Sequence, residues 1–249
     1  MIIGSGLLAR SFGSYFDSNS DACIYAAGVS NSGCNDVTEF KREWFRLTDA
    51  LDRYSHFDSF VYFSTCSVYD PLSISSAYVQ HKLNMEELVS HHSRYLVVRL
   101  PQVAGNTPNP HTLLNYIFSR ISRSEKLKVW KNARRNIIDV DDVVCIVRRL
   151  VNEDGIRGEC INVANFEDIS MPRIVDIMAN VVGKKAICDF LDYGGGYSID
   201  TTRIQEVVNR CGISFDQDYT ERVIRKYYER YVYDARLGAS SEKSLPRVT

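Results

Sequence analysis

The sequence predicts an α/β fold built around a doubly wound, mostly parallel sheet, and three observations support that prediction. Short apolar runs alternate with amphipathic stretches along the chain, which is typical of strand–helix–strand units. The first apolar run leads into a glycine-rich turn at Gly4. Later apolar runs stop at Gly28 and at Pro101, as strands do where they enter a loop.

The composition favours a soluble globular protein and excludes several other classes. Hydrophobic residues make up 45% and charged residues 24% of the 249 residues, which is enough for a sizeable core. The formal net charge of −1 gives no basis for a nucleic-acid partner. No apolar run approaches the roughly 18 residues of a membrane span, so we expect no membrane association.

The cysteines and histidines indicate a cytoplasmic protein without a metal site. The seven cysteines are scattered and never stand at C-x-x-C spacing, which is typical of free thiols in a reducing compartment. Met1 to Gly4 carry neither the basic region nor the cleavage site of a signal peptide. The five histidines show no H-E-x-x-H arrangement.

The expected elements form a Rossmann-type nucleotide-binding core and a small substrate-binding subdomain. Strands are expected over residues 1–3, 22–27, 60–63, 95–100, 128–130, 137–140 and 160–163. Helices are expected over residues 7–16, 36–54, 78–90, 113–121, 141–151, 171–182 and 216–233. The core would comprise residues 1–105 and part of 136–165, the subdomain 106–135 and 166–237, and residues 238–249 a disordered tail.

The turn after the first strand matches the G-x-G-x-x-A fingerprint of a dinucleotide site. Gly4 permits the tight turn, Gly6 lets the backbone approach a pyrophosphate, and Ala9 keeps helix and strand close. The helix that follows offers backbone N–H groups from its first residues, which include Leu7 and Leu8. We therefore expect NAD or NADP here, with a purely structural turn as the alternative.

One feature of such a site is missing. An acidic residue normally follows the fingerprint by about 20 positions, at the end of a second strand, and holds the ribose. Here Asp17 to Asp21 alone separate the first helix from the strand that begins at Ala22. The sequence thus predicts a shortened nucleotide half whose sheet begins at residues 1–3. It also predicts a weakly held adenosine end, unless Asp17 or Asp21 takes an unusual role.

Tyr78 and Lys82 form a Y-x-x-x-K pair on a predicted helix. Residues four apart share one face, so phenol and ammonium would lie side by side. A neighbouring cation lowers the pKa of a tyrosine, which makes the phenol a usable acid or base for an alcohol oxygen. Thr65 follows the strand of residues 60–63 and could bind the same oxygen, or it could only cap a turn.

With these residues placed, the chain resembles the extended short-chain dehydrogenase/reductases, the NAD-dependent epimerase/dehydratase superfamily that modifies sugar nucleotides. The segment GSGLLA is similar to its nucleotide loop, IYAAGVSN to the strand under the cofactor, and FSTCSVYD to its S-[ST]-x-x-V-Y-G segment. The segment YVQHK is similar to its catalytic pair, VVRLPQVAG to the strand beside the nicotinamide, and RRNIIDVDDVV to its R-D-[FY]-I-H-V-D-D segment. CINVANFEDIS resembles the segment before its late helix.

The resemblance implies a role for each matched residue. Thr65, Tyr78 and Lys82 would be catalytic, and Tyr78 and Lys82 would also contact the cofactor. Thr65 and Gln102 would contact the substrate, and Arg135 would grip its nucleotide diphosphate. The remaining cofactor contacts would come from Ala26, Ala27, Gly28, Pro101 and Val103.

The chain also departs from the family pattern. Gln102 stands in place of an asparagine and Asn136 in place of an aspartate, and the loop from Thr65 to Tyr78 is short. Cys66-Ser67 replace the Asp-Glu pair of the 4,6-dehydratases, which disfavours that reaction. One branch of the family inverts carbon centres with a Cys/His pair, and its cysteine follows the catalytic Ser/Thr by two positions. Cys66 follows Thr65 by only one position, so we interpret Cys66 as a buried filler and His81 as a solvated side chain.

Two classes of function remain open. The first is an NAD(P)-dependent oxidoreductase acting on a nucleotide-linked sugar, with a keto-sugar reductase of surface-polysaccharide or deoxysugar biosynthesis preferred over a C4 epimerase. A homodimer is expected for it. The second is a non-catalytic binding protein that kept the fold. The Thr-Tyr-Lys set favours the enzyme, and the shortened nucleotide half favours the binding protein.

Overall fold

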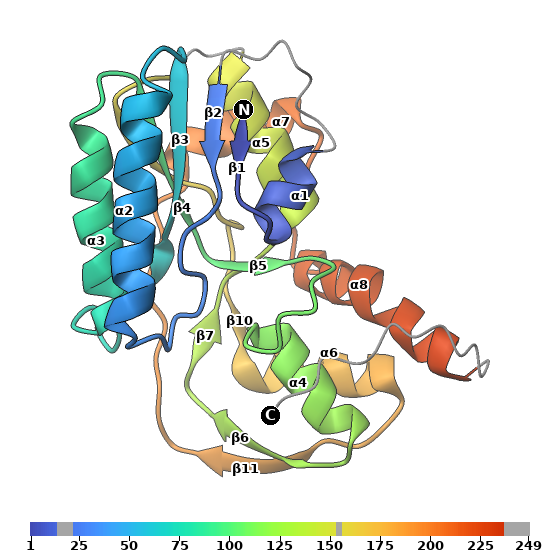
Figure 1. The fold of residues 1–249 in the computed structure, drawn as a ribbon. Helices are drawn as coiled ribbons and strands as arrows, with labels where there is room; N and C mark the ends of the chain where they lie inside the picture. Colours follow the sequence, from blue (N-terminus) through green and yellow to red (C-terminus); the bar gives the residue numbers. More distant parts are fainter. Residues whose placement is uncertain (14–21, 153–155, 237–249) are drawn as a thin grey trace. The chain divides into compact units, whose positions relative to one another are not determined.

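The computed structural model describes residues 1–13, 22–152 and 156–236, and the chain divides into two compact units (Figure 1). The first unit comprises residues 1–101, 140–164 and 198–213, and the second comprises 102–139, 165–197 and 214–249. Residues 102–105 and 136–139, expected in the core, cluster with the second unit. Residues 198–213, expected in the subdomain, cluster with the first. The expected tail, 238–249, lies outside the described residues.

A five-stranded parallel sheet forms the middle of the first unit. Its order is β1-β2-β3-β4-β9, and every neighbouring pair runs parallel. The strands are β1 (Ile2–Ile3), β2 (Ala22–Tyr25), β3 (Ser59–Thr65), β4 (Tyr95–Leu100) and β9 (Glu159–Asn162). Both β2 and β3 are buried along their whole length because helices cover both faces of the sheet. The predicted doubly wound parallel sheet is confirmed.

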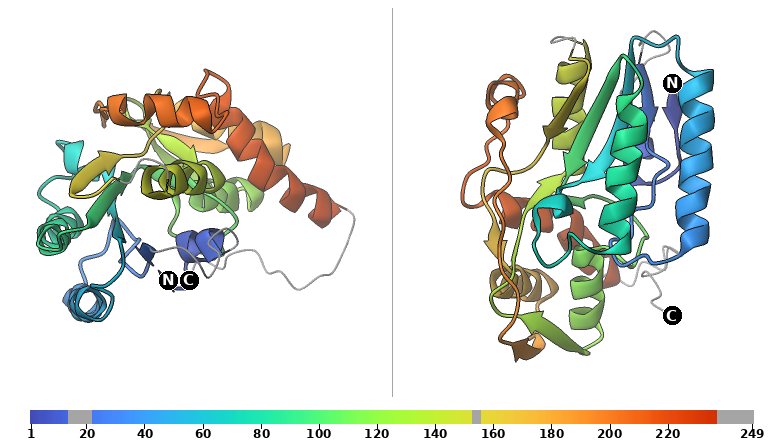
Figure 2. Two further views of the ribbon diagram at one scale, coloured as in Figure 1. Left: turned by 90° about the horizontal axis from the view of Figure 1, so that it is seen from above. Right: turned by 90° about the vertical axis from the view of Figure 1, so that its left-hand side faces the viewer.

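Two pairs of helices cover the faces of this sheet (Figures 1 and 2). One face carries α2 (Val37–Arg53) and α3 (Ala77–Ser90), and the other carries α1 (Leu7–Gly13) and α5 (Val140–Asn152). Short helices complete the unit: η1 (Cys66–Tyr69), η2 (Thr202–Ile204) and α7 (Gln205–Arg210). The core beneath α2 and α3 is rich in aromatic and aliphatic side chains, among them Tyr25, Leu47, Phe60, Tyr62 and Met85.

The sheet of the first unit starts at β1. Among the described residues, β1 pairs with β2 alone, and no strand lies outside it. The predicted helix of residues 7–16 is described as far as Gly13. The connection from Asp17 to Asp21, with the unusual role considered for either aspartate, lies outside the described residues.

In its described residues, the second unit combines three helices with three two-stranded sheets. The helices are α4 (Leu113–Ser122), α6 (Met171–Val182) and α8 (Tyr219–Arg236). Strand β5 (Gln102–Ala104) pairs with β8 (Ile137–Asp139), β6 (Lys126–Trp130) with β11 (Ile187–Leu191), and β7 (Arg134–Arg135) with β10 (Ile169–Ser170). Helix α6 has the predicted ends, since Ser170 caps it and Gly183 ends it in the left-handed conformation.

Several element boundaries differ from the prediction for local reasons. Helix α8 begins at Tyr219 rather than Asp216, because the Asp216 carboxylate accepts the Asp218 N–H and holds a turn there. The sequence pattern missed β5, β7, β10, β11 and α7, which are short or half exposed. No helix of the described residues is both long and apolar enough to cross a membrane.

Candidate active site

Thr65 is the last residue of β3, and its side chain acts on two neighbours. Its Oγ1 accepts the N–H of Ser67 at 3.1 Å and caps η1, which is the structural role left open by the sequence. The Thr65 side chain also lies near enough to the phenol of Tyr78 to lower its pKa. The threonine and tyrosine singled out by the sequence are therefore neighbours at the carboxyl end of a central strand, where parallel sheets place their ligands.

Tyr78 and Lys82 lie one turn apart near the start of α3. The helix begins there because the Ser76 side chain accepts the N–H of Val79 at 3.2 Å. Both Tyr78 and Lys82 are buried. Burial raises the pKa of Tyr78, and the Thr65 side chain only partly opposes this. The expectation that Lys82 lowers the pKa of Tyr78 is wrong, because the Lys82 ammonium pairs with another group.

That group is Glu43 of α2, a buried carboxylate that the sequence analysis missed. Its Oε1 accepts from Lys82 Nζ at 3.1 Å and from the Tyr62 hydroxyl at 2.7 Å. Its Oε2 accepts the N–H of Val29 at 2.6 Å and lies 2.9 Å from His81 Nε2. Glu43 therefore connects α2 with β3, α3 and the loop after β2.

The charges of this cluster, Glu43 and Lys82, stabilise each other. Burial raises the pKa of Glu43, but the Lys82 charge and the hydrogen bonds from His81, Val29 and Tyr62 bring it down to about 2. Burial lowers the pKa of Lys82, and Glu43 acts in the opposite direction. A buried charge needs such a partner, since desolvation without one costs several kcal/mol, on the order of the stability of a domain.

A helical pattern could have revealed Glu43. The buried positions of α2 are Glu43, Leu47 and Ala50, which follow the i, i+4, i+7 spacing of one helix face. The neighbouring Trp44 lies off this stripe and is 43% exposed. A carboxylate within a buried stripe indicates a partner of opposite charge, and that signal was available.

A second buried carboxylate, Glu86, lies one turn beyond Lys82 on α3. Its Oε1 accepts from the Ser64 hydroxyl at 2.5 Å and from Arg99 Nε at 2.9 Å. Arg99 Nη1 in turn donates to the Tyr69 hydroxyl at 2.8 Å. This network ties α3, β3, β4 and η1 together and fixes the loop after Thr65.

The glycine loop lies directly against the residues that follow β2. Gly4 has φ +133°, and a Cβ there would lie 2.4 Å from the carbonyl oxygen of Ala26 and 3.1 Å from the N of Ala27. A Cβ on Gly6 would meet nothing within 4 Å. A Cβ on Gly28 would lie 2.8 Å from Lys82 Nζ. The structure thus brings Gly4, Ala26 and Ala27 together and places Gly28 beside Lys82.

The other predicted cofactor residues occupy the expected elements. Leu7 and Leu8 open α1, and both are half buried. Pro101 directly follows β4, while Gln102 and Val103 begin β5 in the second unit. There Val103 pairs with Ile138 of β8.

In the second unit, Arg135 borders an aromatic cluster that the sequence did not suggest. Its guanidinium lies 6.0 Å from the centre of the Trp130 ring, and Tyr193 packs edge-on against Trp130 at 4.9 Å. Trp130 is 40% and Tyr193 49% exposed, so this cluster is accessible within its unit. Arg134 is directed elsewhere, since it donates to the carbonyl of Asp168.

Cys66 and His81 take part in packing. Burial raises the pKa of Cys66, so it remains a thiol, and Cys66 is buried as interpreted. His81 is also buried and lies flat on Phe40 with ring centres 4.4 Å apart. The interpretation of His81 as a solvated side chain is therefore wrong, because Glu43 supplies a buried partner.

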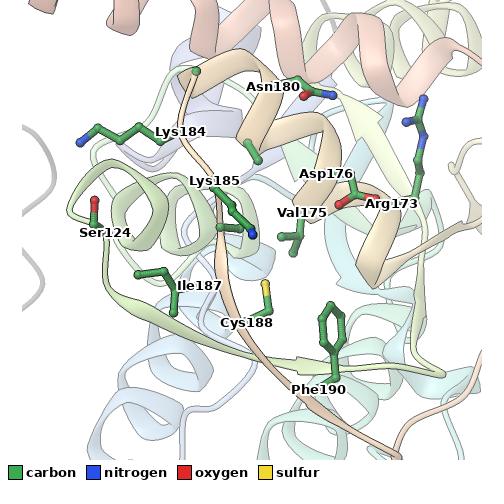
Figure 3. A pocket seen from close by; sticks show the side chains of 13 residues that line it. Ser124, Arg173, Val175, Asp176, Asn180, Lys184, Lys185, Ile187, Cys188 and Phe190 are labelled. Carbon is green, nitrogen blue, oxygen red and sulfur yellow. The ribbon is translucent and has the colours of Figure 1, made fainter.

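A hollow of about 1250 Å³ opens in the second unit, between α6 and β11 (Figure 3). Arg173, Asp176, Lys184 and Lys185 are among its lining side chains, and none of the predicted site residues lines it. Within the described part of the chain, no group of three or more His, Cys, Asp or Glu could hold a metal ion.

The fold is shared with several proteins of known structure. The dTDP-glucose 4,6-dehydratase of Bacillus anthracis, solved with NAD, is 15% identical with a TM-score of 0.68, over 87% of this chain and 74% of that one. The UDP-glucuronic acid 4-epimerase of Bacillus cereus, solved with UDP-glucuronic acid and NAD, is 19% identical with a TM-score of 0.69, over 85% and 76%. RMD from Pseudomonas aeruginosa, solved with NADPH, is 20% identical with a TM-score of 0.61, over 90% and 85%.

The family assignment comes from the sequence. No curated protein matches the chain. The model of the NAD dependent epimerase/dehydratase family matches residues 11–164, which is more than half of the chain and includes Thr65, Tyr78 and Lys82. The chain belongs to the NAD dependent epimerase/dehydratase family.

Proposed function

We propose that this protein is an NAD(P)-dependent oxidoreductase that reduces a keto group of a nucleotide-linked sugar. The observation that carries the proposal is the placement of Thr65 at the end of β3, with buried Tyr78 and Lys82 one helical turn apart on α3. Family membership and the cofactors bound by the similar structures support it. A cytoplasmic location and a homodimer remain predictions from the sequence.

The residues of the first unit fit a nicotinamide dinucleotide at two of its parts. The space beside Gly6 leaves room for a pyrophosphate against the loop backbone. Lys82 and Gly28 adjoin each other, so a ribose near Gly28 would meet a cation. When bound, the dinucleotide supplies or accepts the hydride. The described residues add no strand beyond β1 to support the adenosine part.

The phenol of Tyr78 would supply the proton of the reaction. Its raised pKa keeps it protonated at neutral pH, ready to donate to an oxygen that gains charge. Thr65 would donate to the same oxygen and hold it near the phenol. Proton donation is what reduction of a ketone requires, and a protonated Tyr78 can supply it.

A C4 epimerase is the second candidate, because an epimerase is among the similar structures. An epimerase retains its cofactor through the whole cycle, whereas a reductase exchanges it at every turnover. A weakly held adenosine end therefore favours the reductase.

The aromatic cluster of the second unit suits the nucleotide of the substrate. Trp130 presents an exposed ring for a base, and Arg135 places a cation beside it. A planar guanidinium binds phosphate oxygens in pairs, which suits a diphosphate.

The cofactor prediction is tested by purification and titration. The protein should purify free of dinucleotide and bind NADH and NADPH weakly, within a few-fold of each other. Each lost charge-assisted hydrogen bond to a ribose costs about 1.5–3 kcal/mol, or roughly tenfold and more in affinity. Nicotinamide fluorescence measures both affinities, and release of stoichiometric, tightly held NAD would favour the epimerase instead.

Gly6→Ala separates binding from folding in the same titration. Because a Cβ there meets nothing within 4 Å, the Tm should stay unchanged, while NADH affinity falls as the methyl occupies the space for the pyrophosphate. Gly4→Ala is the contrast, since its clash with Ala26 should lower the Tm itself. Unchanged NADH affinity in Gly6→Ala would place the pyrophosphate elsewhere.

Tyr78→Phe should abolish turnover and leave NADH affinity within a few-fold of wild type. General acid–base catalysis is worth about 10²–10⁴-fold, and the phenol proton is needed only in the chemical step. Turnover is followed as NADH or NADPH consumption with a panel of nucleotide-linked keto sugars. A variant as active as wild type would remove Tyr78 from the mechanism. A wild type that binds dinucleotide but turns over nothing would favour a binding protein.

Arg135→Ala should raise the KM for the nucleotide sugar and spare the affinity for NADH. The expected change is on the order of tenfold or more, because a charge-assisted hydrogen bond is worth about 1.5–3 kcal/mol. Arg120→Ala is the matched control, since this cation of the second unit pairs with Glu125. An unchanged KM in Arg135→Ala would point to Arg134 or to a different substrate class.

A further inference from the structure

We propose that Glu43 is the positioning residue of Lys82: its carboxylate fixes the direction of the Lys82 ammonium and keeps it charged for a ligand hydroxyl. The role of that ligand as a nicotinamide ribose rests on the proposed function. The part concerning Glu43 and Lys82 rests on their geometry alone.

The Glu43 carboxylate is itself held in one place. It is 1% exposed, and both of its oxygens have two partners, contributed by the loop after β2, by β3 and by α3. The backbone N–H of Val29 and the hydroxyl of Tyr62 leave it little freedom to turn. A fixed anion of this kind gives a flexible lysine side chain a single preferred end point.

Lys82 keeps one donor for a ligand. An ammonium has three N–H groups. Among the described residues, Lys82 Nζ donates to Glu43 Oε1 at 3.1 Å and to the Tyr62 hydroxyl at 2.7 Å. The third N–H has no hydrogen-bond acceptor among the described side chains and backbone, and Gly28 lies so close that a Cβ there would be 2.8 Å from Nζ. The remaining donor is the one that we assign to a ligand hydroxyl.

The proposal requires a carboxylate at position 43 rather than any hydrogen-bonding group. Lys82 is 3% exposed, and a buried ammonium without a counter-charge loses its proton at a lower pH. An amide would preserve the shape, and its oxygen can still accept the Val29 N–H, but its NH2 group would then replace the oxygen that accepts from Tyr62 and Lys82, and it would supply no charge. Glu43→Gln therefore removes the counter-charge of Lys82 with the least change of shape.

Several titratable groups face this pair and enter any pH profile. They are Tyr25 of β2, Tyr62 of β3, and Tyr78, His81 and Glu86 of α3. His81→Gln removes the imidazole and retains a side-chain donor toward Glu43. If the midpoint of the pH profile of NADH affinity is unchanged in His81→Gln, that midpoint does not report the titration of the histidine.

The experiment compares Glu43→Gln with wild type and with Glu39→Gln. Glu39 lies on the same helix and pairs with Arg42 at the surface, so it is a matched control. In Glu43→Gln we expect NADH affinity to fall tenfold or more at pH 8. The loss of affinity with rising pH should also begin at least one pH unit lower, because Glu43 raises the pKa of Lys82. Glu39→Gln should bind within twofold of wild type, and Glu43→Asp should recover part of the affinity.

A double-mutant cycle distinguishes positioning from mere stability. If Glu43 acts through Lys82, Glu43→Gln should weaken NADH binding less than twofold in a Lys82→Met background. That double variant removes both charges together and remains measurable if Glu43→Gln alone folds poorly. An equal loss in both backgrounds, or wild-type affinity and pH profile in folded Glu43→Gln, would overturn the proposal.

A direct measurement covers the case in which wild type binds neither NADH nor NADPH. That result would refute the proposed function but not the role of Glu43. The side-chain ¹³Cε resonance of Lys82, assigned with Lys82→Met, then reports the ammonium titration without any ligand. Its midpoint should fall by at least one pH unit in Glu43→Gln, and an unchanged midpoint would refute the role of Glu43.

Discussion

The first unit is organised around the buried ion pair between Glu43 and Lys82. Helices α2 and α3 and strand β3 meet at these charges, and each contributes a polar side chain to the cluster. Burial of such a group without a partner would destabilise the fold. The pair is satisfied only when α2, α3 and β3 hold their native positions together. Because an incomplete set leaves an uncompensated charge, the cluster favours one arrangement of these elements over near alternatives.

The same arrangement determines what Tyr78 can do. A free ammonium one turn away would favour the ionised phenolate, but here Glu43 balances that ammonium, and burial keeps the phenol protonated. The Y-x-x-x-K pair therefore combines a proton donor with a fixed, compensated cation. The chemistry of this pair therefore depends on Glu43, a residue that lies outside the motif.

Local pattern was sufficient for most of the first unit. Apolar runs identified all five strands of the sheet, and the short link before Ala22 correctly predicted that β1 would be the outer strand of the described sheet. Local pattern was insufficient to predict buried residues whose partners are distant in the sequence. Glu43 and Lys82 are 39 positions apart, and nothing in the helix of either residue shows that the other will neutralise it. The aromatic cluster of Trp130 and Tyr193 escaped prediction similarly, because pairing of β6 with β11 brings it together.

The shortness of β1 has a consequence for association between molecules. An edge strand offers unpaired N–H and C=O groups that can recruit strands of other chains, and long flat edges are prone to aggregate. In the described residues β1 is two residues long and pairs on one side with β2. Such a short edge strand offers a neighbouring chain few backbone groups to pair with. The shortness of β1 therefore protects this edge of the sheet against edge-to-edge aggregation.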